Sequence, residues 1–139
     1  MKTKNKGSIG ELKVMVDLSE RGFGVAQPHG DNLPFDIIAI SDTFNMYKIQ
    51  VKFISKRNGT VTLKNQSNTE TKTKRYSKQY NAKEVDYFAI YCPETDKVYY
   101  IPQERIGDSY SFLLRIDKTN NNQNKKINWA TDYENIMLC

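Results

Sequence analysis

The sequence has few of the residues that build metal or disulfide frameworks. Among 139 residues it has two cysteines, Cys92 and Cys139, and a single histidine, His29. The cysteines lie far apart with no metal-ligand spacing around them, and His29 has no second ligand nearby in the sequence. This composition argues against a zinc site and against a disulfide framework.

Long apolar runs are also missing. No stretch approaches the roughly 18 apolar residues of a membrane span. The N-terminal residues, MKTKNKGS, lack the apolar core of a signal peptide. We therefore expect a soluble, cytoplasmic protein. The length suits one domain with a modest core, covering residues 1–139, and neither an internal repeat nor a second domain is visible.

Acidic residues are scarce in one part of the chain. From Lys48 to Lys83 there are ten Lys or Arg and one acid, Glu70, a local balance of +9, whereas the remainder has eleven Lys or Arg against fifteen acids. A basic block within a near-neutral chain indicates a polyanionic partner such as nucleic acid. A solvated loop face would produce the same pattern, so charge alone does not choose between the two.

What the sequence does contain is a predicted β-hairpin from Phe35 to Ile54. Two apolar-alternating runs, FDIIAI and MYKIQVKFI, flank the polar turn SDTFN. Asp36 opens the first run, and Gln50 and Lys52 of the second run share one face because they are two residues apart. A solvated face would explain the lysine, but aspartate is disfavoured in strands. A carboxylate and a lysine on adjacent strands can instead hold a metal ion and a phosphate.

A helix is predicted ahead of the hairpin, after a basic arm at residues 1–7. Ser8 and Glu11 have the spacing of a capping box, and Gly22 supplies a stop signal. Glu11 falls inside the apolar arc of this helix, so two interpretations remain open. Either it closes the capping box, or it meets the sheet as a second carboxylate of a metal site. The arc consists of Ile9, Leu12, Val14, Met15, Val16 and Leu18.

The remaining elements follow from turn signals and periodicity. The turn-rich segment 28–34 is expected to be a loop, as is 65–73. Residues 72–84 have weak helical character, with tyrosines and lysines one turn apart, and a mobile loop is the alternative. Residues 118–126 are polar enough for a linker or loop, and 127–139 are expected to pack on the domain or on a second subunit. Strands are predicted at 23–27, 60–64, 85–92 and 97–101, with a helical turn at 103–106 and a last strand or amphipathic segment at 109–116.

In its order of elements the chain resembles the PD-(D/E)-X-K nuclease superfamily, in which a helix with a glutamate precedes strands carrying Asp and then (D/E)-X-K. Leu33-Pro34-Phe35-Asp36 corresponds to the P-D element, with Phe35 inserted. Gln50-Val51-Lys52 corresponds to (D/E)-X-K, with glutamine in place of the acid. The compact length, the Q-x-K variant, the stretch DYFAIYCPETDKVYYIP and the late INW segment look most like the group I intron-encoded homing endonucleases.

The resemblance implies an α/β fold with a restriction-endonuclease-like core, a mixed β-sheet flanked by helices. It also implies Mg²⁺- or Mn²⁺-dependent, site-specific cleavage of double-stranded DNA. Asp36 would be the main metal ligand, Glu11 a second, and the backbone carbonyl of Val51 a third. Gln50 would ligate the metal or position water without adding charge, which weakens metal affinity. Lys52 would orient the water or stabilise the developing charge.

Basic residues after the motif are the expected DNA contacts, and each ion-paired phosphate would make binding salt-sensitive. A chain of 16.1 kDa offers little surface for a long target. A homo-oligomer, dimer or tetramer, with one active site per subunit is therefore expected to cut both strands. The predicted phosphate contacts are Lys56, Arg57, Lys64, Lys72, Lys74, Arg75 and Lys78.

Two other functions are compatible with the same motifs. One is a structure-specific nuclease on this fold, of the Holliday-junction resolvase or repair type. The other is a DNA-binding module that has lost catalysis, with Gln50 as the sign of that loss. A structure-specific nuclease would cut branched DNA whatever its sequence, whereas a homing-type enzyme would cut linear duplex at one position. A DNA-binding module would show no metal-dependent cleavage at all.

Overall fold

The computed structural model describes residues 2–65, 67–70, 75–78, 80–119 and 126–136, with only the backbone described at 67–70 and 75–78. The described elements, in chain order, are α1 (Thr3–Glu20), β1 (Gly24–Ala26), β2 (Ile37–Ile40), β3 (Met46–Phe53), β4 (Thr60–Lys64), β5 (Ser67–Glu70), β6 (Arg75–Lys78), β7 (Tyr87–Cys92), β8 (Lys97–Pro102), α2 (Gln103–Ile106), β9 (Ser111–Arg115) and the 3₁₀ helix η1 (Ala130–Tyr133).

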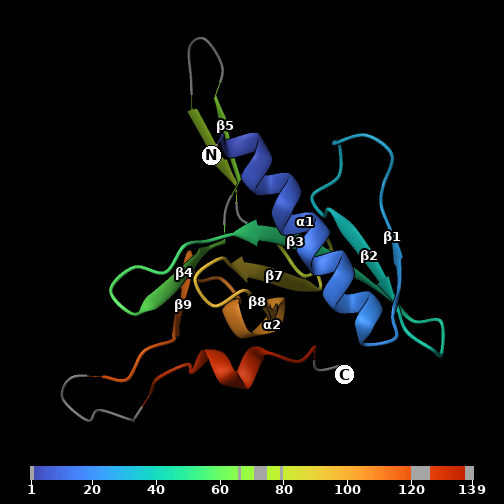
Figure 1. The fold of residues 1–139 in the computed structure, drawn as a ribbon. Coiled ribbons are helices and arrows are strands. Elements are labelled where there is room, and N and C mark those ends of the chain that lie inside the picture. Colours follow the sequence, from blue (N-terminus) through green and yellow to red (C-terminus); the bar gives the residue numbers. More distant parts are fainter. Residues whose placement is uncertain (1, 66, 71–74, 79, 120–125, 137–139) are drawn as a thin grey trace.

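A five-stranded mixed sheet forms the centre of the fold, in the order β1-β2-β3-β7-β8 (Figure 1). All neighbouring strands are antiparallel except β3 and β7, which are parallel. The predicted hairpin of β2 and β3 is confirmed, with Ile37 opposite Ile49 and Ile40 opposite Met46. Two smaller antiparallel pairs, β4 with β9 and β5 with β6, lie outside this sheet. The predicted mixed sheet with flanking helices is thus confirmed.

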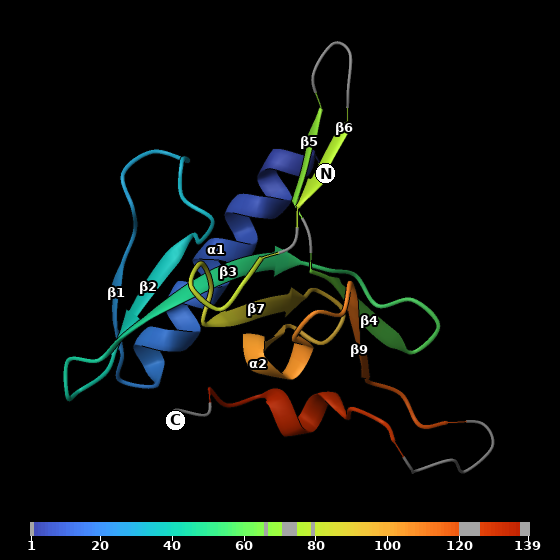
Figure 2. The same ribbon diagram turned by 180° about the vertical axis from the view of Figure 1, so that it is seen from behind.

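Each face of the sheet has its own core. Helix α1 covers one face, where Val14 and Leu18 pack with Val51 and other apolar residues of β2, β3, β7 and β8. The opposite face is covered by β4, β9, α2 and η1 (Figure 2). Gly10 marks where α1 crosses β3: a Cβ there would stand 3.4 Å from Val51 Cγ1 and 3.5 Å from Phe53 Cβ, which are ordinary van der Waals distances. This contact places the residue after Gly10 near the C-terminal end of β3.

The start of helix α1 was predicted wrongly. The helix begins at Thr3, its N-cap Lys2 has no side-chain cap bond, and Ser8 lies well inside it. Ser8 and Glu11 therefore cannot form a capping box, and the residues of the expected basic arm form the first helical turns instead. The physical reason is that nothing in TKNKG prevents helix formation once packing further along anchors the helix. The predicted stop is confirmed, because Gly22 follows the helix with φ +89°.

The buried side of α1 also differs from the predicted arc. Gly10, Val14 and Leu18 are buried, whereas Leu12 is 58% exposed and Val16 is 55% exposed. The side of the helix that packs on the sheet includes a glycine, and a count of hydrophobic residues does not include glycine. The predicted apolar side was therefore centred on the wrong face of the helix.

Residues 75–78 form a strand, so neither the weak helix nor the loop expected over 72–84 is right there, and residues 67–70, inside the loop predicted for 65–73, also form a strand. Strands β5 and β6 pair from Ser67 opposite Lys78 to Glu70 opposite Arg75. Both views show this pair extending away from the body of the protein (Figures 1 and 2). Helix propensity is a weak preference, and cross-strand hydrogen bonding of a Ser-, Thr- and Tyr-containing segment overrides it.

The described part of the C-terminal segment packs on the domain, which is one of the two arrangements expected for it. Ala130 and Tyr133 of η1 are buried in one core, and Ile136 packs against the other. Most of the predicted linker lies outside the described residues, at 120–125. Within the described ranges, no helix is both long and apolar enough to cross a membrane.

Candidate active site

Asp36 is held by the backbone of β3. It directly precedes β2, and its own N–H donates to the Ile49 carbonyl at 2.9 Å. Its carboxylate oxygen Oδ2 accepts a hydrogen bond of 2.8 Å from the Val51 N–H. The carboxylate thus takes the place of a backbone carbonyl as the acceptor for the Val51 N–H. This role explains why an aspartate stands at the start of an apolar run.

Gln50 and Lys52 lie on either side of Val51 in β3, and both are half-buried. The parallel register places Gln50 opposite Phe88 and Lys52 opposite Ile90 of β7. Burial lowers the pKa of the Lys52 ammonium, and the nearby charge of Asp36 opposes that shift. Asp36 and Lys52 thus lie close enough for their charges to interact.

Glu11 reaches the same place from helix α1. It is half-buried, and its pKa is raised first by burial and then by the negative charge of Asp36. Burial likewise raises the pKa of Asp36, against the opposing effects of the Val51 hydrogen bond and Lys52. Because α1 begins at Thr3, Glu11 has no capping role. The structure thus places Asp36 close enough to both Glu11 and Lys52 for its charge to act on each, and Gln50 and Val51 directly precede Lys52 on β3.

This donor set fits a hard divalent ion with few protein ligands. Within the described residues, no group of three or more His, Cys, Asp or Glu gathers at one place. Glu11 and Asp36 are a pair of neighbouring carboxylates, and Gln50 occupies the position of the acid in the (D/E)-X-K pattern. Mg²⁺ is usually bound through one or two carboxylates and keeps several waters. The raised pKa values of Glu11 and Asp36 mean that it is costly for both to be ionised together. A bound cation would offset that cost by stabilising the two negative charges.

The predicted phosphate contacts are only partly visible. Lys56 is engaged in an ion pair with Asp117 at 3.2 Å. Arg57 and Lys64 are exposed, and neither forms an ion pair within the described part of the chain. The others lie on or beside the β5–β6 hairpin: Arg75 and Lys78 belong to β6 with undescribed side chains, and Lys72 and Lys74 lie outside the described residues.

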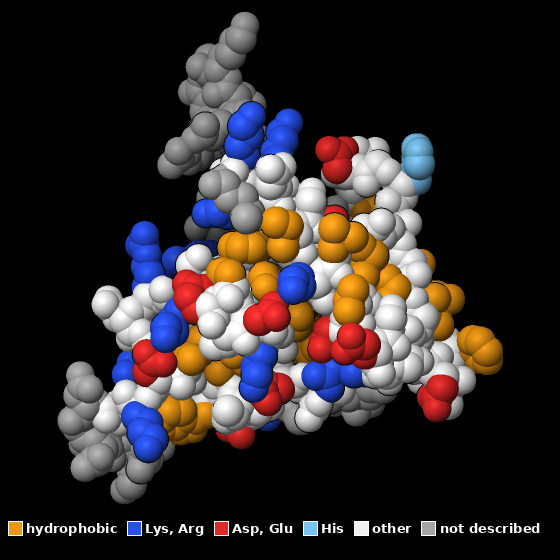
Figure 3. All heavy atoms as spheres, viewed as in Figure 1, with side chains coloured by type: hydrophobic (Ala, Val, Ile, Leu, Met, Phe, Trp, Pro, Cys, Tyr) orange, Lys and Arg blue, Asp and Glu red, His pale blue; other side chains and the backbone are white. Residues whose placement is uncertain are grey.

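The start of α1 adds basic residues that the sequence analysis did not include. Lys2, Lys4 and Lys6 are exposed, and Figure 3 shows Lys and Arg side chains gathered over this end of the helix and beside β5. Lys6 lies over the Phe53 ring at 5.9 Å, and with Arg57 it lines a hollow of about 370 Å³ beyond the end of β3. A charge count that included the expected arm would have found these lysines.

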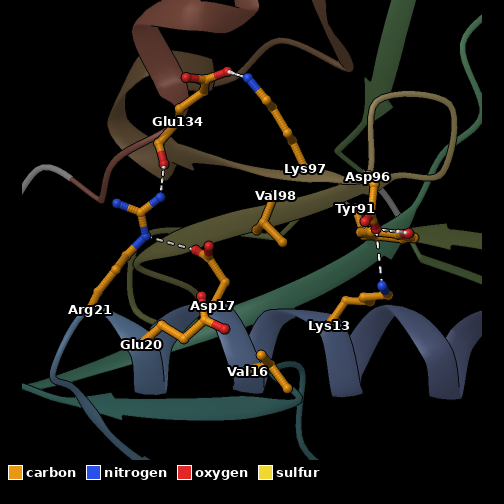
Figure 4. Close-up of a pocket in the computed structure, with 10 residues that line it drawn as sticks. All are labelled: Lys13, Val16, Asp17, Glu20, Arg21, Tyr91, Asp96, Lys97, Val98 and Glu134. Atoms are coloured by element: carbon orange, nitrogen blue, oxygen red, sulfur yellow. Dashed lines mark hydrogen bonds and ion pairs between the residues drawn. The ribbon is translucent and has the colours of Figure 1, made fainter.

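A different hollow, of about 330 Å³, lies between α1, β8 and the C-terminal segment (Figure 4). It contains none of the predicted site residues, and each lysine or arginine that lines it is paired with a carboxylate. The pairs are Lys13 with Asp96 at 3.0 Å, Arg21 with Asp17 at 2.8 Å and Lys97 with Glu134 at 2.7 Å. The Lys13 pair joins α1 to the turn before β8, and the Lys97 pair joins β8 to the C-terminal segment. Arg21, besides its pair within the end of α1, donates to the Glu134 carbonyl at 2.7 Å, so the lining residues of this hollow connect the three elements.

Comparison with known proteins identifies the fold and its chemistry. A family described as PD-(D/E)XK endonuclease matches residues 1–136. The chain belongs to the PD-(D/E)XK endonuclease family. It is therefore an enzyme that hydrolyses phosphodiester bonds, and the family implies DNA as the substrate and generally uses divalent metal ions. Sequence comparison found no match among curated proteins.

A solved structure supports the same fold. It is that of the bacterial homing endonuclease I-Ssp6803I, with a TM-score of 0.78 over 96% of this chain and 88% of that one, at 22% sequence identity. The restriction-endonuclease-like architecture expected of a PD-(D/E)XK endonuclease is confirmed by this match.

Proposed function

We propose that this PD-(D/E)XK endonuclease is a Mg²⁺-dependent, site-specific enzyme of the intron-homing type that cuts both strands of duplex DNA. The observation that carries the proposal is that Asp36, hydrogen-bonded to the Val51 N–H, lies close enough to both Glu11 and Lys52 for its charge to act on each of them. The resemblance of the Q-x-K motif to the homing endonucleases, together with the structural likeness to I-Ssp6803I, supports the finer assignment.

In this proposal each residue has a separate role. Asp36 and Glu11 hold the divalent ion, with the Val51 carbonyl as a further oxygen ligand, and Gln50 ligates the ion or positions a water without adding charge. When bound, the ion supplies a water nucleophile at neutral pH and neutralises charge on the phosphate. Lys52 orients the attacking water or stabilises the negative charge that develops in the transition state.

The proposed DNA surface lies around the start of α1 and the β5–β6 hairpin. The lysines of α1 are exposed there, and the hairpin extends from the same end of the protein (Figure 1). A single site cuts one strand at a time, so we propose a homo-oligomer, dimer or tetramer, with one site per subunit. Light scattering coupled to size-exclusion chromatography measures this state directly.

The test is incubation of the protein with a supercoiled-plasmid library and Mg²⁺, followed by sequencing of the cut ends. Cleavage of both strands at one recurring sequence supports the proposal. Cleavage restricted to branched DNA, whatever its sequence, would instead identify a structure-specific nuclease. Binding of duplex DNA without metal-dependent cleavage would identify a module without catalysis. An Asp36→Asn variant, assayed in parallel, controls for contaminating nucleases.

A further inference from the structure

The ammonium of Lys52 lies against an aromatic ring. Its Nζ stands 5.6 Å from the centre of the Tyr80 ring, within the range in which a cation is attracted to a π face. Tyr80 is on neither strand of the predicted hairpin; it follows β6 in the segment that leads to β7. Tyr80, which is close in sequence to the basic β5–β6 hairpin, therefore contacts the proposed catalytic residue Lys52.

The Tyr80 ring is held from behind by the core. It packs edge-on against Phe88 of β7, with ring centres 5.8 Å apart and planes at 68°. Phe88 is fully buried, so it gives the ring a rigid support. The Tyr80 carbonyl also accepts a hydrogen bond of 3.5 Å from Nε2 of the buried Gln103. The ring is therefore placed by packing and by its backbone together.

The segment after Tyr80 is attached to the same strand that carries Lys52. The Asn81 side-chain oxygen accepts bonds from the N–H groups of Lys83 at 2.9 Å and Glu84 at 3.2 Å, which shapes a tight turn. Lys48 of β3 donates from Nζ to the Lys83 carbonyl. The Lys48 N–H also donates to the Asp86 carboxylate at 2.8 Å, and the Asp86 N–H donates to the Lys48 carbonyl at 2.8 Å.

A lysine side chain needs such a support if its amine is to act at a defined point. Its four-carbon chain is flexible and loses considerable rotamer entropy when ordered. Lys52 forms no ion pair within the described part of the chain. Asp36 acts on it as a nearby charge, which attracts the amine without defining its direction, whereas a ring face restricts where the ammonium can lie.

We propose that Tyr80 is the positioning residue for Lys52, its ring holding the ammonium at the active site. The proposal rests on the function proposed above for Lys52, and it extends the site to a residue outside the family motif. Tyr80 also lies just beyond the end of β6, so the residue that contacts Lys52 is close in sequence to the basic β5–β6 hairpin.

The first test compares Tyr80→Phe with Tyr80→Leu in single-turnover cleavage. Phenylalanine keeps the ring, so its rate should stay within about twofold of the wild-type rate, whereas leucine should lower the rate by roughly tenfold. The dissociation constant for DNA measured in EDTA should stay unchanged in both. Wild-type cleavage by Tyr80→Leu, or equal loss in both variants, would overturn the proposal.

Tyr133→Leu is the matched control for loss of a packed ring. Tyr133 packs edge-on against Phe112 with centres 5.8 Å apart and planes at 78°, a geometry close to that of Tyr80 with Phe88. Tyr133 belongs to η1, which packs against β8, and β7 separates β8 from the strand of Lys52. Both leucine variants should lose thermal stability, and only Tyr80→Leu should lose cleavage rate. Equal loss of rate in the two would mean that general destabilisation explains the effect.

The second test does not depend on cleavage. The protein is labelled with lysine carrying ¹³C at Cε, and the Lys52 signal is assigned by its absence in Lys52→Arg. Ring currents should shift its Hε protons upfield in the wild type and in Tyr80→Phe, and the shift should vanish in Tyr80→Leu. A Lys52 signal that is unchanged in Tyr80→Leu refutes the contact. Wild-type protein that shows the shift but never cleaves DNA would refute the proposed function instead.

Discussion

The carboxylate of Asp36 accepts a hydrogen bond of 2.8 Å from the backbone N–H of Val51, the residue between Gln50 and Lys52. This bond joins the two halves of the motif. It places the aspartate against the part of β3 from which the glutamine and the lysine extend. The Val51 side chain packs under α1 and contacts Gly10, the residue that precedes Glu11 in the helix. The β2–β3 pairing and the α1 packing thus meet at one strand residue.

Asp36→Asn should abolish cleavage and leave DNA binding largely intact. The asparagine oxygen can still accept the Val51 bond, so the fold is kept while the charge that would hold the ion is removed. We expect a loss of at least about 100-fold in single-turnover rate. Asp31→Asn, in the exposed segment before β2, is the matched control and should cleave normally. Full activity of Asp36→Asn would exclude Asp36 as the main ligand.

Lys52→Ala should likewise abolish cleavage with little effect on DNA affinity. The change removes the only proposed positive charge at the reacting phosphate other than the ion. Rates are measured under single-turnover conditions, and affinity is measured by anisotropy in EDTA. Lys97→Ala removes an exposed lysine that is paired with Glu134 and should behave as wild type. A variant that binds DNA weakly but cleaves normally once bound would place Lys52 among the phosphate contacts instead.

Glu11→Gln separates a metal ligand from a structural residue. Since α1 begins at Thr3, the glutamate caps nothing, and its replacement by glutamine should not lower the melting temperature. Because burial and Asp36 raise the pKa of Glu11, removing its charge should if anything raise the melting temperature at neutral pH. The cleavage rate should fall by roughly tenfold or more, because the site would keep a single carboxylate. Glu20→Gln, at the other end of the helix and exposed, is the control. Parallel loss of melting temperature and rate would point to a structural role.

Gln50→Glu tests whether the glutamine lies beside the ion. A third carboxylate would raise the negative charge of the site, so the Mg²⁺ concentration at half-maximal cleavage should fall several-fold. The measurement is a Mg²⁺ titration of the cleavage rate, with the exposed Gln27→Glu as control. An unchanged titration curve would place Gln50 outside the metal site.

The raised pKa of Asp36 predicts how stability depends on pH in EDTA. Because burial raises this pKa, the folded chain favours the protonated carboxyl. Stability from this group is present below the unfolded carboxyl pKa of about 4 and is lost as pH rises through the raised folded pKa. An asparagine side chain does not titrate, so the Asp36→Asn variant should gain melting temperature over the wild type as pH increases from about 4 to about 8. A constant difference across that range would contradict the prediction.

Much of the fold could be predicted from local patterns. The alternation of MYKIQVKFI indicated β3 and placed Gln50 and Lys52 on one face, and the apolar runs around Phe88 and Tyr99 indicated β7 and β8. The prediction of β3 succeeds because burial alternates along a strand that has one packed side, and those of β7 and β8 succeed because strands buried on both sides read as continuous apolar runs. The start of α1 and the strand β6 were missed, since both depend on contacts with distant segments more than on local preference.

By itself, the sequence determined the order of the elements and the residue types of the site. Asp36 at the start of an apolar run and the spacing of Gln50 from Lys52 are local features, and they identified the motif. Only the tertiary structure decided that Glu11 faces Asp36 and that Tyr80 covers Lys52. Those contacts arise where α1 crosses β3 at Gly10 and where Phe88 supports a ring from outside the sheet. Close packing between segments distant in sequence sets such contacts, and no local periodicity records them.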